Sequence, residues 1–366
     1  MWLFLFPGME KQTVFYTHNL KEALKMKQVF KHVVALLVVS LVIAGPVGAS
    51  VSTQTSLTDS SFNRMIAKAM TDISAVKGSQ DLLCLTNAPY VKYNGQPGID
   101  CLKSIQDLTG CSVGSQNLLF FQRPQYSPLS ITLFHKATGD AVVMSMEKDG
   151  FTVERLELSR SNLSSNAFWK GTEGLTCKPE LFTIATIAGS WAIGTPYDYL
   201  KCAEIHNHLC PGVSSGYLIS RLIMDKYPLK EGEKYTMISA PVWCKEDAFQ
   251  AILDLTPGKG GMIVNNLTQT QKDKISVDHP AGILLITDNR TGAGRGVAFS
   301  FDFDKINQLA PKDTPKAALV LAIVDYLDQP RRFVNIAKEF DVTPEMAREM
   351  TTAGFNPYEV AGLTKP

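Results

Sequence analysis

The stretch KYTMISAPVWCKEDAFQAIL, residues 234–253, joins a strand pattern to a helix pattern. Residues 234–240 are mostly apolar, aromatic or β-branched, and a proline follows them. This pattern predicts a strand. Residues 245–253 carry apolar side chains at helical spacing and predict a helix. We therefore expect a strand, a short loop that carries Cys244, and a helix.

The same order of elements extends outward from this stretch and occurs a second time in the chain. Apolar periodicity and turn residues predict a helix, strand, helix and three strands at residues 213–227, 234–240, 245–253, 261–266, 281–287 and 294–301. The earlier copy has these elements at residues 62–73, 81–87, 99–108, 117–122, 129–135 and 140–146.

Matching residues support the interpretation of these two copies as an internal duplication. Asn87-Ala88-Pro89 corresponds to Ser239-Ala240-Pro241, and Gln106 corresponds to Gln250. We predict an α+β protein of two tandem α-β-α-β-β-β modules. Each module is expected to be a mixed four-stranded sheet covered by helices, and a helical tail follows.

The predicted boundaries divide the chain into five parts. The first module occupies residues 50–150, and a polar linker follows at 151–179. The second module occupies 180–310 and opens with a helix near 181–193, and the tail occupies 311–366. Thr343-Pro344 is expected to begin a helix in that tail, because threonine caps helices and proline fits their first turn.

Residues 1–49 have the pattern of a secretory signal. The apolar run HVVALLVVSLVIAG at 32–45 follows Lys27 and Lys31 and precedes Ala49, where we expect cleavage. Met26 is a more natural start than Met1. The alternative is an uncleaved anchor, which would be the protein's one route to a membrane. Either alternative places the protein outside the cytoplasm, as an exported protein.

Charge argues against one class of partner. The 366 residues include 36 Lys plus Arg and 35 Asp plus Glu. A protein without excess positive charge has no broad surface to attract a phosphate backbone, so we expect no nucleic acid partner.

The segment KCAEIHNHLCPGVSSG, residues 201–216, concentrates metal-ligating side chains ahead of a predicted helix. Imidazole and thiolate are the donors that zinc prefers, and a loop allows near neighbours to converge on one ion. Cys210 is expected at the cap of the helix, where the helix dipole favours a thiolate. We predict a divalent transition metal, zinc first, bound by His206, His208, Cys210 and Cys244.

Other roles for the cysteines stay open. A Cys202–Cys210 or a Cys210–Cys244 disulfide, or a reactive thiol without metal, would also explain this segment. Cys84, Cys101 and Cys111 of the first module could form a disulfide or remain buried thiols, and Cys177 has no evident partner. Residues 56–61 replace the His/Cys segment in the first module, which therefore cannot bind metal in the same way.

Two motifs of the second module resemble those of the FmdE-type domain family, which is named after formylmethanofuran dehydrogenase. They are His206-Asn207-His208-Leu209-Cys210-Pro211-Gly212 with Gly216-Tyr217, and Cys244-Lys245-Glu246-Asp247-Ala248-Phe249-Gln250. The first module resembles the family only in its second half, as a degenerate copy. The resemblance implies a mixed sheet, a metal at the His/Cys segment and a tendency to dimerise, which the duplication could satisfy as a pseudo-dimer within one chain.

We expect an exported metal-binding protein that captures or delivers a metal or a metal-containing small molecule. The alternative is an enzyme outside the cytoplasm that uses the metal or a thiolate. Glu204 and Asp247 are then candidates for a general base, unless they are only solvated charges. A second alternative is an extracellular interaction module stabilised by disulfides.

Overall fold

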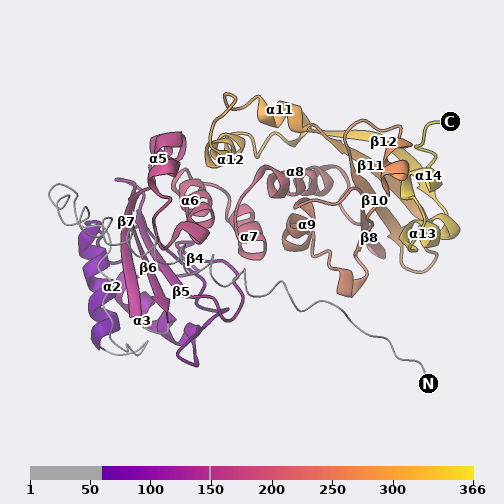
Figure 1. The fold of residues 1–366 in the computed structure, drawn as a ribbon. Coiled ribbons are helices and arrows are strands. Elements are labelled where there is room, and N and C mark those ends of the chain that lie inside the picture. The colour runs from indigo at the N-terminus through magenta and orange to yellow at the C-terminus, as the bar shows by residue number, and fades with distance from the viewer. Residues whose placement is uncertain (1–59, 148–149) are drawn as a thin grey trace, which may run out of the picture. The chain divides into compact units, whose positions relative to one another are not determined.

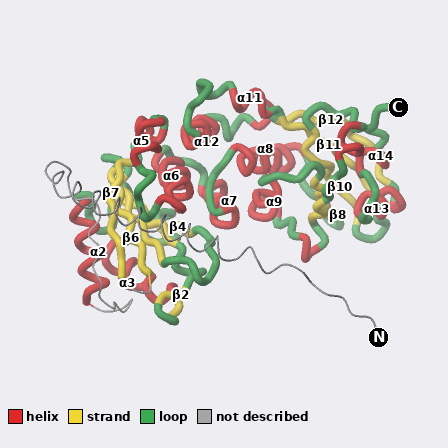
Figure 2. The backbone as a smooth tube through the Cα atoms, viewed as in Figure 1, coloured by secondary structure: helices red, strands yellow, loops and turns green. Residues whose placement is uncertain are grey.

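The structure is a computed structural model that describes residues 60–147 and 150–366. The predicted signal segment at residues 1–49 lies outside this range. Within it, no helix combines the length and the apolar character needed to cross a membrane. Helices and strands alternate along the chain (Figure 2) and build two principal sheets, each flanked by helices (Figure 1).

The first sheet has five strands in the order β4-β1-β5-β6-β7. β1 and β4 are parallel, and all other neighbours are antiparallel. The sheet strands are β1 Leu82–Thr86, β4 Leu118–Phe120, β5 Leu129–His135, β6 Asp140–Glu147 and β7 Gly150–Glu157. The other elements of this part are α2 Ser60–Asp72, the two-stranded ribbon β2 Lys92–Tyr93 and β3 Gln96–Pro97, η1 Gly98–Cys101 and α3 Leu102–Thr109.

Four helices lead to the second sheet, and the last of them ends at His206. They are α4 Arg160–Leu163, α5 Asn166–Gly171, α6 Lys178–Ala192 and α7 Tyr197–His206. The second sheet is built from β8 Glu233–Ser239, β9 Met262–Val264, β10 Pro280–Asp288, β11 Gly294–Phe301 and β12 Val334–Val342. Its helices are α8 Pro211–Lys226, α9 Lys245–Leu253, η2 Pro257–Lys259, α10 Gln269–Asp273, α11 Phe303–Asn307, α12 Lys316–Val324, η3 Pro330–Arg332, α13 Pro344–Thr351 and α14 Pro357–Val360.

The two sheets share one topology. Starting from its parallel edge, the second sheet has the order β9-β8-β10-β11-β12, in which β8 and β9 are parallel and the rest are antiparallel. The predicted α+β class and the mixed sheets are confirmed. The predicted number of strands is wrong, because each sheet has five strands where four were expected.

The two missed strands lie in the segments that were predicted as linker and as helical tail. β7 lies in the predicted linker and pairs with β6. β12 lies in the predicted tail and pairs with β11. Both are edge strands in which polar and charged residues are mixed with apolar ones, as in VNIAKEFDV of β12, where exposed and less exposed residues alternate. A strand that is half exposed needs only every second residue to be apolar, so these segments resemble polar connections.

Helices cover both faces of each sheet. Leu82 and Cys84 of β1 pack with α2 and α3. The alternate residues Leu83 and Leu85 point to the other face and belong to the hydrophobic cluster that contains α6. In the second sheet, Met237 of β8 lies on the side of α8 and α9, and the opposite face is covered by α13 and α14 (Figure 1). Central strands buried on both faces explain the continuous apolar run LLCLT of β1.

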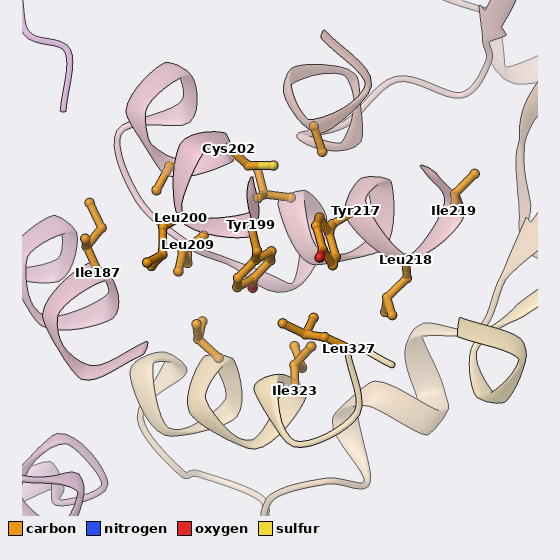
Figure 3. Packing of buried hydrophobic residues seen from close by; sticks show 14 of the residues in the cluster. Ile187, Tyr199, Leu200, Cys202, Leu209, Tyr217, Leu218, Ile219, Ile323 and Leu327 are labelled. Atoms are coloured by element: carbon orange, nitrogen blue, oxygen red, sulfur yellow. The ribbon is translucent and has the colours of Figure 1, made fainter. Parts of the chain in front are cut away.

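A shared core fixes α7 and α8, the two helices that precede and follow the His/Cys segment. Tyr199 of α7 and Tyr217 of α8 make an edge contact with ring centroids 4.9 Å apart, and Leu327 and Ile323 approach them from the segment of α12 (Figure 3). The Tyr199 hydroxyl hydrogen-bonds with Ser214 Oγ at 2.7 Å. Buried aromatic pairs with satisfied hydroxyl groups hold helices in a defined register.

Candidate metal centre

Three of the four predicted ligands come together at the ends of three helices. His206 is the last residue of α7, Cys210 caps the N-terminus of α8, and Cys244 immediately precedes α9. One ligand atom from each residue lies within 4.8 Å of the others. Because Cys244 is far from the other two residues in sequence, the helix packing itself creates the site.

The bend between α7 and α8 depends on local backbone chemistry. Asn207 ends α7 in the left-handed conformation with φ of 71°, which asparagine tolerates better than most residues. Pro211 occupies the first turn of α8, where no amide is needed. The amide of Val213 donates a hydrogen bond to Cys210 Sγ at 3.4 Å, so the sulfur takes the place of a capping oxygen.

Two glycines of α8 allow α9 to approach closely enough to bring the cysteines together. A Cβ atom on Gly212 would lie 3.1 Å from Cys244 Sγ, and one on Gly216 would lie 2.2 Å from the carbonyl oxygen of Lys245. The first glycine therefore leaves room for the second sulfur, and the second lets the two helices touch backbone to backbone. These contacts give a physical reason for glycine at both positions.

The loop that delivers Cys244 is held by a buried ion pair. Lys245 is fully buried, and its Nζ atom lies 2.5 Å from both Glu246 Oε1 and the Pro241 carbonyl oxygen. Glu246 also accepts hydrogen bonds from Ser239 Oγ and the Trp243 amide. A buried charge pair whose remaining hydrogen-bonding groups are satisfied can specify one loop conformation.

Asp247 orients His206. The imidazole Nδ1 atom lies 2.7 Å from Asp247 Oδ2, and the Nε2 atom lies 3.6 Å from Cys210 Sγ. A carboxylate on one ring nitrogen leaves the other available for a metal, an arrangement that metal-binding histidines commonly show. Asp247 follows Cys244 by one turn of α9, so helical spacing could have indicated that both residues face the site. In the structure, Asp247 positions the imidazole of His206.

Without a metal, the three groups form a coupled hydrogen-bonded cluster. The hydrogen bond with Cys244, together with amides at the α8 N-terminus, outweighs burial and lowers the pKa of Cys210 to about 7. The same Cys210 contact raises the pKa of Cys244 to about 12. Burial opposes the charged form of His206, but Asp247 and Cys244 outweigh it and raise its pKa to about 9. These opposite shifts favour a thiolate at Cys210, the form of cysteine that binds a cation.

His208 lies beside this cluster but does not belong to the group of three. Its ring centroid is 4.5 Å from that of His206 and 5.2 Å from that of Phe182. Burial and the neighbouring His206 lower the pKa of His208 to about 4, which keeps the ring neutral. The structure thus brings His206, Cys210 and Cys244 together and places His208 against them.

The remaining cysteines and Glu204 lie elsewhere. All seven cysteines are free thiols, so neither alternative disulfide of Cys210 is formed. Cys202 is buried in α7 and Cys177 at the start of α6, while Cys84, Cys101 and Cys111 are buried together in the first sheet's core. Glu204 accepts a hydrogen bond from the Tyr90 hydroxyl at 2.6 Å and pairs with Lys201.

The donor set fits a zinc-like cation. Two thiolates and one imidazole are preferred zinc ligands, and tetrahedral coordination places a sulfur and a nitrogen ligand about 3.5 Å apart, close to the observed Cys210–His206 separation. Three protein ligands leave one coordination position for water, His208 or an added ligand. Asn207 Oδ1, within the same bend, is buried and has no hydrogen-bond partner among the described residues.

We expect D247N to weaken zinc binding by about 10- to 100-fold, the usual cost of losing an outer partner of a metal-bound histidine. The amide cannot stabilise the imidazole as the carboxylate does, although it has the same shape. A competition titration with a chelator measures the effect. D254N is the matched control, because Asp254 lies at the other end of α9 and pairs with Lys259 on the surface. An equal affinity in both variants would contradict the role of Asp247.

Comparison with known proteins agrees with this geometry. The family described as FmdE, Molybdenum formylmethanofuran dehydrogenase operon, matches residues 205–329. The chain contains one FmdE domain. This domain begins one residue before His206 and includes all three clustered ligands, whereas the family is not detected over the first sheet. No curated protein matches the chain.

Proposed function

We propose that this protein binds a divalent transition metal, zinc first, through His206, Cys210 and Cys244, and presents it to an exchangeable ligand. The observation that carries the proposal is the convergence of three helix ends on one point, with Asp247 fixing the histidine. We further propose that the protein works outside the cytoplasm, where it captures or delivers the metal or a metal-containing small molecule. The apolar run at residues 32–45 supports export.

A metal-dependent enzyme is the second candidate. Catalytic zinc sites have three protein ligands and one open position, whereas structural sites are closed by four. The three-residue cluster favours the open type. A metal in it would supply Lewis acidity, while His206 and the two cysteines would hold it and Asp247 would keep the imidazole oriented.

We also propose that the first sheet derives from an internal duplication and pairs with the FmdE domain as a pseudo-dimer within one chain. The equal strand order and strand directions of the two sheets support this origin. The His/Cys segment has no counterpart in the first copy, so one metal is expected per chain.

X-ray absorption of the zinc-loaded protein tests the proposed function. We expect two sulfur ligands and one imidazole at the distances of a zinc site, about 2.3 Å and 2.0 Å, with a light atom in the fourth position. H208A should keep its metal content. If its spectrum shows one imidazole ligand fewer than that of the wild type, His208 is the fourth ligand, as the sequence predicts. H206A should lose most of the metal. Equal metal content in H206A and the wild type would contradict the proposal.

A further inference from the structure

The side of the cluster next to His208 is lined by residues from outside the FmdE domain. His208 contacts Phe182 of α6, and Phe182 in turn lies 6.3 Å from Trp169 of α5 between ring centroids. Both aromatic residues precede residue 205, where the family match begins. The surroundings of the metal site are therefore completed by the part of the chain that the family does not cover.

Arg123 reaches this region from the loop after β4. Its Nε atom lies 3.3 Å from Glu180 Oε1, and its Nη2 atom donates to Thr183 Oγ1 at 3.1 Å. Thr183 is adjacent to Phe182, the residue that contacts His208. The Arg123 side chain is 19% exposed. No acceptor for Nη1 occurs among the described residues, so one edge of the guanidinium fork is free for a ligand.

Loops of the first sheet are held against the last turn of α7. The Tyr90 hydroxyl, after β1, donates to Glu204 Oε1, and the amide of Gln122, after β4, donates to the Glu204 carbonyl oxygen at 3.3 Å. Glu204 precedes His206 by two residues. These contacts give Arg123, the neighbour of Gln122, a fixed position relative to the metal site.

The guanidinium of Arg123 is mostly buried and is paired with one carboxylate, that of Glu180. A partly dry cation that keeps an unused donor attracts an anion.

We propose that Arg123 binds the carboxylate or phosphate group of a small-molecule ligand while another atom of that ligand occupies the open position of the metal. This inference rests on the proposed function, since it names the ligand class for the same site. It gives the first sheet a role: it supplies the arginine that recognises the anion. Arginine presents two parallel N–H groups to such oxyanions, which adds geometric selectivity.

A second cationic region provides the comparison. A groove with a volume of about 620 Å³ is lined by Arg221, Asp225 and residues 327–332. Its arginines are engaged: Arg331 pairs with Asp225 at 3.5 Å, and Arg332 lies over the Tyr326 ring at 4.1 Å. Arg331 is paired with a carboxylate, as Arg123 is with Glu180, so it is a control for general charge effects.

The experiment uses the full chain loaded with cobalt, whose visible spectrum responds to a change of metal ligand. Inorganic phosphate and acetate are titrated separately, so that the two arms distinguish the two oxyanions. We expect a spectral change with one or both anions and a dissociation constant raised roughly tenfold in R123Q, as for the loss of one charge-assisted contact. R123K should show a smaller increase, and R331Q should match the wild type.

Metal content and thermal unfolding of every variant are measured in parallel. A wild type without bound metal would overturn both the proposed function and this inference. If the spectrum of the metal-loaded wild type does not change with either anion, or if R123Q binds the anion as tightly as the wild type, the inference alone is overturned. A loss of affinity in R331Q equal to that in R123Q would also overturn it.

Discussion

C210S is expected to lose zinc almost completely at concentrations where the wild type is saturated. The thiolate is a direct ligand, so its loss should exceed the roughly 10- to 100-fold cost of losing an outer partner. Serine can still cap α8 through its hydroxyl, because Cys210 already accepts the Val213 amide bond in that role. The fold should therefore survive while the metal is lost, and elemental analysis of the purified protein measures the difference.

C202A is the matched control for this substitution. Cys202 lies eight residues before Cys210 in sequence, but its thiol is buried in the core on α7 (Figure 3). Its replacement by alanine costs packing, on the order of 1 kcal/mol, and leaves the donor set intact. Full metal content in C210S, or equal losses in C210S and C202A, would contradict the assignment of Cys210 as a ligand.

The candidate cluster was recognisable in the sequence because most of its information is local. His206, His208 and Cys210 fall within one bend, and a cysteine before a helix is recognisable from the proline that follows it. Cys244 was harder to assign, yet a strand end followed by a helix puts it at the same kind of position. Spacing could not separate His208 from the three clustered residues, because its ring packs against Phe182, a contact that spacing does not encode.

The sheets were only partly predictable for a different reason. Central strands such as β1 have continuous apolar runs and were found, whereas edge strands β7 and β12 carry charges on their open face. Nothing local distinguishes such a segment from a linker before its pairing partner is known. The contacts of Arg123 could not be predicted from the sequence either, because Glu180 and Thr183 are 57 and 60 positions away from it.

G216A should destabilise the protein strongly, although alanine usually favours helices. An added Cβ would lie 2.2 Å from the Lys245 carbonyl oxygen and 2.8 Å from its Cα, both backbone atoms that a rotamer change cannot move. We expect a loss of about 3 kcal/mol, the upper end of ordinary overpacking costs. The midpoint of thermal unfolding should then fall by roughly 5–10 °C for a chain of this size. Separation of α8 and α9 should also weaken zinc binding, because it moves Cys210 away from Cys244.

Alanine at two other helical glycines serves as a control, because it shows how a glycine-to-alanine change affects stability without this backbone clash. Nothing lies within 4 Å of a Cβ on Gly171, so G171A should be neutral or slightly stabilising. A Cβ on Gly189 would meet flexible ends of Leu163 and Leu321, which can shift at small cost. The expected order of stability is therefore G171A above G189A above G216A. If G216A unfolded at the same temperature as G171A and kept its zinc, the close backbone contact between α8 and α9 could not be what holds the two cysteines together.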